Sequence, residues 1–231
     1  MSSSRSPTST SSSSSSTCCC PASSALSIVS PTYLYCLTAH EAPDPPAATV
    51  GVDGGPVRRI RNAQAPGAQA WVGDVDARSV KATIDRIRAH DSVVATALGT
   101  GSTPLPARFG QTFASDDECL AMISARQEKM SAGLARVAGM VEMTVILRVA
   151  VDTSSGTAYL KSLARREHAV QDLSKRLGDC IRLSAERAKD DVVTLSHLVD
   201  REAVTKYLER LTGLDVRVLG PGAPYSFTPP E

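Results

Sequence analysis

One arginine of this sequence lies in an apolar, proline-containing segment near the middle of the chain. The segment STPLPARFGQTF spans residues 102–113 and places Arg108 between Pro106 and Gly110. A guanidinium in such surroundings can take part in catalysis, bind a charged group, or hold two parts of the protein together by hydrogen bonds. Catalysis would also require a nucleophile, a general base or a set of metal ligands elsewhere in the chain.

The remaining polar residues lack the spacing that catalysis requires. No G-x-S-x-G nucleophile motif occurs in the sequence. His40–Glu41 and His90–Asp91 are adjacent pairs, and neighbouring residues on a helix point in different directions, so we interpret both as surface polar residues. The glycine-rich GTGS at 99–102 follows a predicted helix, whereas a phosphate loop precedes one. The sequence therefore predicts no catalytic residues, and we expect that the protein is not an enzyme.

Metal and cofactor sites are not expected either. The acidic residues at 116–118 fall in the first turn of a predicted helix, where negative charge stabilises the helix dipole. His197 lies on a predicted strand and is interpreted as a core or interface residue. The six cysteines contain no C-x-x-C pair, and three of them are adjacent at 18–20. Three isolated cysteines are predicted to be buried free thiols: Cys36, Cys119 and Cys180.

Composition and charge exclude several classes of partner. The 231 residues include 25 Lys and Arg against 24 Asp and Glu, a net charge of +1, which argues against a nucleic-acid-binding protein. The longest apolar runs, such as VILRVAV at 145–151, are shorter than the roughly 18 residues of a membrane span. The early run ALSIV at 25–29 is too short for a secretory signal. We therefore expect no nucleic acid and no membrane as partners, and a cytoplasmic location.

The first half of the chain predicts a disordered tail followed by a small α+β domain. Residues 1–30 are rich in Ser and Thr and cannot bury enough apolar surface to order. Because foldable sequence begins at Tyr33, a further hypothesis is that this tail lies upstream of the natural start of the chain. Asp76 is predicted to cap a helix over 79–98, with an apolar seam at Val80, Ile84, Ile87, Val94 and Leu98. Hydrophobic alternation predicts strands at 32–38, 56–62, 70–76 and 103–109.

The second half predicts alternating helices and strands. Ser115 and Glu118 form a capping box that opens a helix reaching Gly139. A near-heptad seam predicts one long helix from about 157 to 189, which suits a helical hairpin. The other predicted elements are strands at 141–151, 191–200 and 214–220 and a helix at 201–213. We expect an α+β protein with an N-terminal domain at 31–112 and a C-terminal ferredoxin-like domain with a long helical hairpin at 113–231.

Two apolar segments with aromatic residues beside turns are unusual in a chain that is only 4% aromatic. They are LPARFG at 105–110 and GPGAPYSF at 220–227. They either clamp the domain junction or cover a sheet edge, or they form an exposed docking surface for another protein. Arg108 is predicted to be buried or half-buried, with Glu142 as a candidate partner. The candidate residues for partner binding or the domain junction are Leu105, Pro106, Arg108, Phe109, Glu142, Tyr225 and Phe227.

Segment 102–113 resembles the LPVRFGT hallmark of the gas vesicle protein F/L family (GvpF/GvpL). Five further segments resemble family motifs in the same order, so that the resemblance covers about 31–228. These are YLYCL at 33–37, HDSVVATAL at 90–98, GMVEMTVILRV at 139–149 with GTAYLKSLARRE at 156–167, and GPGAPYSF at 220–227. The chain departs from the family where Trp and Pro are usual in the tail and where Trp, Gly and Lys are common in the central strand; the residues there are Gly222, Ala223, Met143, Thr144 and Ile146.

This resemblance implies an accessory protein of gas vesicle assembly without catalytic activity. It also implies an N-terminal α+β domain, a C-terminal domain of modified ferredoxin-like fold, and association with the hydrophobic shell protein and other gas vesicle proteins. The expected location is the gas vesicle and the cytoplasm. The alternative from the residues alone is a small-molecule-binding regulatory α+β domain, because ferredoxin-like sheets often hold effector pockets.

Overall fold

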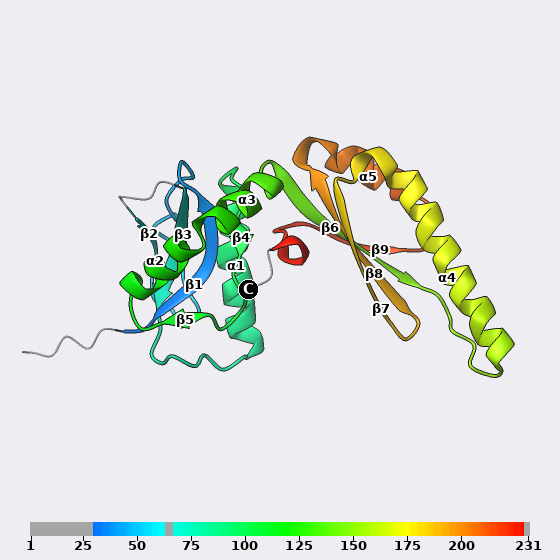
Figure 1. Cartoon of the computed structure of the whole chain (residues 1–231), viewed down its shortest axis with the longest axis horizontal. Helices are drawn as coiled ribbons and strands as arrows, with labels where there is room; N and C mark the ends of the chain where they lie inside the picture. Colours follow the sequence, from blue (N-terminus) through cyan, green and yellow to red (C-terminus); the bar gives the residue numbers. More distant parts are fainter. Residues whose placement is uncertain (1–29, 63–66, 229–231) are drawn as a thin grey trace, which may run out of the picture.

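The structure, a computed structural model, describes residues 30–62 and 67–228 as two antiparallel sheets with helices packed on them (Figure 1). The tail predicted to be disordered at 1–30 lies outside the described residues except for Ser30. No helix in the described ranges is long and apolar enough to cross a membrane.

The first sheet has the strand order β2-β3-β1-β4, with β5 also pairing with β1. The strands predicted at 56–62 and 70–76 are confirmed as β2 and β3, which form an antiparallel pair. Strand β1 is buried along nearly its whole length, since both faces of this sheet are covered. The strands are β1 (Thr32–Ala39), β2 (Val57–Arg61), β3 (Ala68–Asp74), β4 (Leu105–Pro106) and β5 (Thr112–Phe113).

Helices cover the two faces of the first sheet. Helix α1 (Ile84–Gly99) packs on the face that carries Tyr33, Tyr35 and Trp71. Helices α2 (Asp116–Ala125) and α3 (Gln127–Val137) pack on the opposite face. The sequence predicted a single helix here and assigned it to the C-terminal domain at 113–231, but the apolar residues of α2 and α3 contact the first sheet.

The beginning of α1 differs from the prediction. The cap is Thr83, whose hydroxyl accepts a hydrogen bond from the backbone N–H of Arg86, and not Asp76. A loop occupies the first residues of the predicted helix, so the helix has one turn less. Ile84 and Ile87 are consequently 68% and 47% exposed, outside the apolar seam to which the sequence prediction assigned them.

The predicted helix between Ser115 and Gly139 is two helices. The capping box at its start is confirmed in part: the Ser115 hydroxyl accepts the Glu118 amide, while the Glu118 carboxylate accepts the amide of Ala114. The helix ends at Ala125, and Arg126 takes φ −120° and ψ 21° before α3 begins. No Gly or Pro marks this break, which explains why the hydrophobic spacing predicted a continuous helix.

The second sheet has the strand order β7-β8-β6-β9 and is antiparallel throughout. With its helices, the order along the chain is β-α-β-β-α-β. The strands are β6 (Met140–Arg148), β7 (Leu183–Lys189), β8 (Val192–Asp200) and β9 (Arg217–Gly222), and the helical segments are α4 (Gly156–Leu177), η1 (Gly178–Cys180), η2 (Arg201–Ala203) and α5 (Val204–Leu211).

Strand β7 corrects the prediction of one long helix over 157–189. Helix α4 ends at Leu177, and the chain then turns back to pair β7 with β8 over seven residues. The β7 sequence LSAERAK is rich in helix-forming residues, so tertiary pairing overrides its local preference. The expected long helical hairpin is absent from the described residues, because α5 has only eight residues and the α4 seam at Leu173 and Leu177 faces the second sheet.

The prediction that His197 is a core or interface residue is confirmed, because His197 is fully buried at the second sheet. Its Nδ1 lies 2.7 Å from the Tyr207 hydroxyl in the layer between the sheet and α5. Burial lowers the pKa of His197 to about 4, so the imidazole is neutral near pH 7. The predicted buried thiols are also confirmed: Cys36, Cys119 and Cys180 are free and buried.

Candidate functional site

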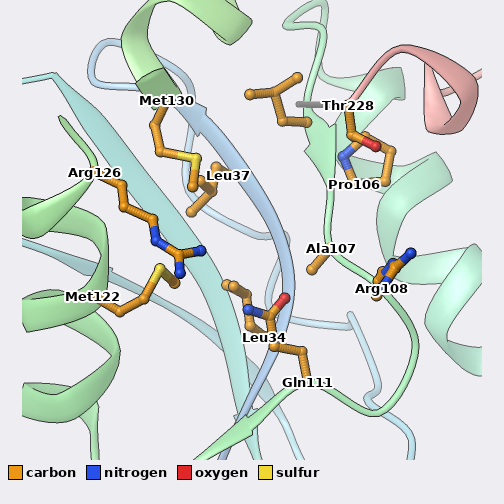
Figure 2. A pocket seen from close by; sticks show the side chains of 11 residues that line it. Leu34, Leu37, Pro106, Ala107, Arg108, Gln111, Met122, Arg126, Met130 and Thr228 are labelled. Atoms are coloured by element: carbon orange, nitrogen blue, oxygen red, sulfur yellow. The ribbon is translucent and has the colours of Figure 1, made fainter. Parts of the chain in front are cut away.

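A pocket of about 330 Å³ opens where β1 and β4 face the break between α2 and α3 (Figure 2). We call it the α2/α3 pocket. Aliphatic and methionine side chains supply most of its lining, with two arginines and a few small polar groups. The lining residues are Leu34, Leu37, Leu105, Pro106, Ala107, Arg108, Gln111, Met122, Arg126, Met130 and Thr228.

A bulge in β1 builds the floor of the pocket. The pairing with β3 shifts between Leu34 and Cys36, which leaves Tyr35 as the extra residue. In a regular strand, residues three apart point to opposite faces, so Leu34 and Leu37 would not share a surface. The extra residue restores them to one face. Both leucines therefore line the pocket, while Tyr33 and Tyr35 face α1.

The helix break places Arg126 at the mouth of the pocket. Figure 2 shows its guanidinium directed between Met122 and Met130 toward Leu37. In a continuous helix, the direction of the residue 126 side chain would be set by the regular period of 3.6 residues per turn and not by this break. Across residues 30–62 and 67–228, Arg126 has no ion pair and no side-chain hydrogen bond. The sequence analysis did not identify Arg126 or Met122 as site residues; the one available signal was an additional apolar side chain, Met122, in the predicted helix between Ser115 and Gly139.

The predicted segment 105–110 lies partly at this pocket. Leu105 and Pro106 are buried and pair with Leu37 and Cys36 of β1. Arg108 lines the pocket but is exposed, so the prediction that it is buried or half-buried is wrong. The reason is that β4 ends at Pro106 and the chain turns outward there. Figure 2 shows the Arg108 guanidinium pointing away from the pocket.

Glu142 lies at the junction between the two sheets and not beside Arg108. Its carboxylate, in a residue that is 9% exposed, accepts hydrogen bonds from the Ser226 amide at 2.8 Å and the Ser226 hydroxyl at 2.7 Å. The Thr144 hydroxyl donates a third bond at 3.4 Å. The sequence suggested that Glu142 pairs with Arg108, but in the structure the C-terminal segment supplies its partners through Ser226.

The C-terminal segment, residues 220–228, lies between the two sheets, as Figure 1 shows in red. Its start requires glycine, because Gly220 has φ +115° and a Cβ there would lie 2.7 Å from the Glu142 carbonyl oxygen. Its end, the short helix η3 (Tyr225–Phe227), packs Phe227 into the core of the first sheet beside Leu198 of β8. The Phe227 carbonyl also accepts a hydrogen bond from Arg136.

Phe109 and Tyr225 meet around a buried histidine. Their rings lie 5.9 Å and 6.5 Å from the His90 ring, and the Tyr225 hydroxyl donates to Asp91 at 3.3 Å. The His90 Nδ1 lies 3.0 Å from the Tyr33 hydroxyl. His90 is 3% exposed, so its interpretation as a surface residue is wrong. Burial lowers its pKa, which favours the neutral ring.

The seven predicted residues therefore occupy three neighbouring places. Leu105, Pro106 and Arg108 line the α2/α3 pocket, Phe109 and Tyr225 contact His90, and Glu142 and Phe227 hold the C-terminal segment at the junction. In the described part of the chain, no three His, Cys, Asp or Glu residues group closely enough to hold a metal ion. Burial raises the pKa of the Cys119 thiol to about 12, so this thiol is a poor nucleophile at neutral pH. The geometry suits binding of an apolar group beside a positive charge.

Comparison with known proteins identifies the family. Residues 31–162, more than half of the chain, match the family described as gas vesicle synthesis protein GvpL/GvpF. The chain therefore belongs to the GvpL/GvpF family, and membership connects it with gas vesicle formation. The resemblance seen in segment 102–113 is confirmed.

Individual relatives agree in sequence and in fold. Gas vesicle protein L from Streptomyces sp. (strain CB03234) is 26% identical over 247 residues, which cover 84% of this chain and 91% of that protein. The crystal structure of gas vesicle protein GvpF from Microcystis aeruginosa superposes with a TM-score of 0.75 at 16% identity, covering 87% of this chain and 100% of the other. GvpF from Anabaena sp. PCC7120 gives a TM-score of 0.74 at 19% identity, with 87% and 97% coverage. These two structures share the α+β fold of this chain.

Proposed function

We propose that this protein is a non-catalytic assembly factor that binds the hydrophobic shell protein of gas vesicles, together with other gas vesicle proteins, in the cytoplasm and at the vesicle. The observation that carries the proposal is the α2/α3 pocket, an apolar, methionine-containing depression on the surface of a GvpL/GvpF family member. Methionine side chains adapt their shape, so they suit surfaces that bind apolar partners.

The physical reason for such a partner is the shell protein's own chemistry. A subunit that polymerises into a wall with an apolar, gas-facing side exposes that side before assembly. Exposed apolar patches and unpaired strand edges cause aggregation in water. A partner that covers apolar side chains of the subunit would keep it available for addition to the wall.

We also propose two domains joined by the C-terminal segment, of which the second is ferredoxin-like. The order β-α-β-β-α-β in β6 to β9 supports this description. The hydrogen bonds from Ser226 to Glu142 and the packing of Phe227 against the first sheet would then hold the two domains together.

Co-purification with a gas vesicle shell protein tests the proposed function. We expect the wild-type chain to retain co-expressed shell protein and the Met122→Glu variant to lose most of it, because a carboxylate in the pocket opposes binding of an apolar group. Leu160→Glu is the matched control. Leu160 is 65% exposed and lies outside the pocket on α4, the helix that packs on the second sheet. Equal loss in both variants, or no retention by the wild type, would contradict the proposal.

A small-molecule-binding regulatory domain is the second candidate. The pocket volume of about 330 Å³ lies at the lower end of the range of about 300–1,000 Å³ for small-molecule sites. A ligand that binds only the folded state raises the melting temperature. A metabolite that raises the melting temperature of a chain without shell-protein binding would favour this candidate; under the proposed function we expect no such shift.

A further inference from the structure

The α2/α3 pocket combines an apolar floor with an arginine that the described structure leaves without a partner. None of its eleven lining residues is acidic. The guanidinium of Arg126 lies between Met122 and Met130 at the mouth (Figure 2). A guanidinium binds a carboxylate through two parallel hydrogen bonds, and neighbouring apolar groups strengthen this pairing by excluding water.

The position of Arg126 is determined by the backbone and not only by its rotamer. Residue 126 is the single non-helical residue between α2 and α3. Ile123 of α2 and Leu134 of α3 are buried in the apolar core against the first sheet, which fixes the two helices on either side of residue 126. The backbone of residue 126 is therefore fixed beside the pocket, and its exposed side chain can reach a ligand that also contacts the apolar floor made by Leu34 and Leu37.

We propose that this pocket recognises a partner segment in which an aliphatic side chain lies next to a carboxylate. The aliphatic group occupies the floor between the leucines and methionines, and the carboxylate pairs with Arg126. This inference rests on the proposed function, because it describes the part of the partner that the pocket binds. The chain's own residues 1–30 contain no Asp or Glu and do not fit this description.

Hexanoate is a minimal probe that carries both features, and hexanol of the same length lacks the charge. The five methionines make ¹³C-methyl NMR a direct readout of the pocket. We expect hexanoate to shift the Met122 and Met130 methyl signals in a dose-dependent way. The methyl signal of Met143, which is buried in the core of the second sheet, should not change. Hexanol should bind about fivefold more weakly, because it lacks the ion pair.

Variants of Arg126 test the role of the charge. We expect Arg126→Gln to bind hexanoate about as weakly as wild type binds hexanol, and Arg126→Lys to recover part of the affinity. Arg88→Gln is the matched control, because Arg88 is an exposed arginine on α1, outside the pocket. Equal binding of hexanoate and hexanol, or unchanged binding in Arg126→Gln, would overturn the inference. Shifts by inorganic phosphate as large as those by hexanoate would also overturn it, since they would show a site for any anion.

Two further experiments distinguish binding of a partner segment from occupation of the pocket by the chain's own C-terminal residues, and failure of this inference from failure of the proposed function. Thr228 lines the pocket, and the residues after it end in Glu231. A chain ending at Thr228 that binds hexanoate more tightly than the full chain would show that the protein's own C-terminal residues occupy the site, and would overturn the inference. Retention of shell protein by wild type and equally by Arg126→Glu would refute the inference but not the proposed function. No retention by wild type, with NMR shifts as expected, would refute the proposed function alone.

Discussion

The junction and the α2/α3 pocket each hold a charged side chain beside apolar residues, but only the junction supplies partners for it. Glu142 accepts three hydrogen bonds from Ser226 and Thr144 and is 9% exposed. Arg126 has no side-chain partner anywhere in the part of the chain that the structure describes. A nearly buried charge that is hydrogen-bonded within the protein stabilises the fold, whereas an exposed charge without a protein partner beside an apolar floor is available to a ligand. We therefore assign the junction to stability and the pocket to recognition. Three measurements, at Phe227, Glu142 and Arg126, test this division, and a fourth tests the buried His197 of the second sheet.

The largest effect is expected at Phe227. Replacement by Ala removes a nearly buried ring from the first core and leaves a cavity, so we expect the free energy of unfolding to fall by about 3 kcal/mol. The melting temperature should fall by about 6–12 °C, measured by circular dichroism. Phe227→Leu, which fills most of the volume, should lose much less. An unchanged melting temperature in Phe227→Ala would show that the C-terminal segment does not hold the two sheets together.

A smaller loss is expected at Glu142. The Glu142→Ala variant removes the carboxylate that accepts hydrogen bonds from the Ser226 amide and hydroxyl. The hydroxyl keeps Ser196 Oγ at 3.0 Å as an alternative acceptor, so the expected loss of about 2 kcal/mol comes mainly from the amide. Ser226→Ala, in which the amide is kept, is the control and should lose about half as much. Chemical denaturation gives both free energies. Equal stability of Glu142→Ala and wild type would place this carboxylate with the recognition residues instead.

Acid is expected to weaken the core through His197. Its folded-state pKa of about 4 is below the ordinary value of about 6.5, so the folded state binds the proton less well than the unfolded state. This contribution is complete above about pH 6.5 and is lost as the pH falls toward 4. We expect a loss of about 2 kcal/mol between pH 7 and pH 5. His197→Gln should reduce the pH dependence of the denaturation midpoint over this window, while the part that comes from the buried His90 remains. A full wild-type slope retained in that variant would contradict the assignment.

The smallest effect on stability is expected at Arg126. Because its guanidinium has no ion pair in the described structure and is exposed, Arg126→Gln should change the free energy of unfolding by less than about 0.5 kcal/mol. Thermal unfolding of this variant beside Arg88→Gln provides the measurement. A clear destabilisation specific to Arg126 would mean that the side chain has a structural role, and the contrast with Glu142 would disappear.

Local patterns predicted most elements of the fold, and they did so where one short-range signal dominated. The strand predicted at 191–200 is β8, and the Ser115 cap predicted the start of α2. The patterns failed at β7, where the residues Ala, Glu, Arg and Lys prefer helix but pair with β8. They also failed at Arg126, where the break has no Gly or Pro to mark it.

The candidate site was predicted only in its linear part. Leu105 and Pro106 belong to a conspicuous apolar segment, and the segment was recognised as a family hallmark. Met122 lies on α2 and Arg126 lies at the break between α2 and α3, and the sequence did not predict that this region packs against the segment. The proposed pairing of Arg108 with Glu142 was wrong, because Ser226, 84 residues beyond Glu142, takes the carboxylate. Such a partner cannot be deduced from spacing along the chain.

The sequence by itself determined the family, the α+β class and most strands and helices, because motifs and hydrophobic periodicity act over a few residues. Tertiary structure alone decided where charge is satisfied and where it is not. The bulge in β1, the break at Arg126 and the return of the C-terminal segment to Glu142 each depend on packing between distant parts of the chain. A charged side chain stabilises the fold or binds a ligand according to the residues that surround it. Only the tertiary structure brings those residues together.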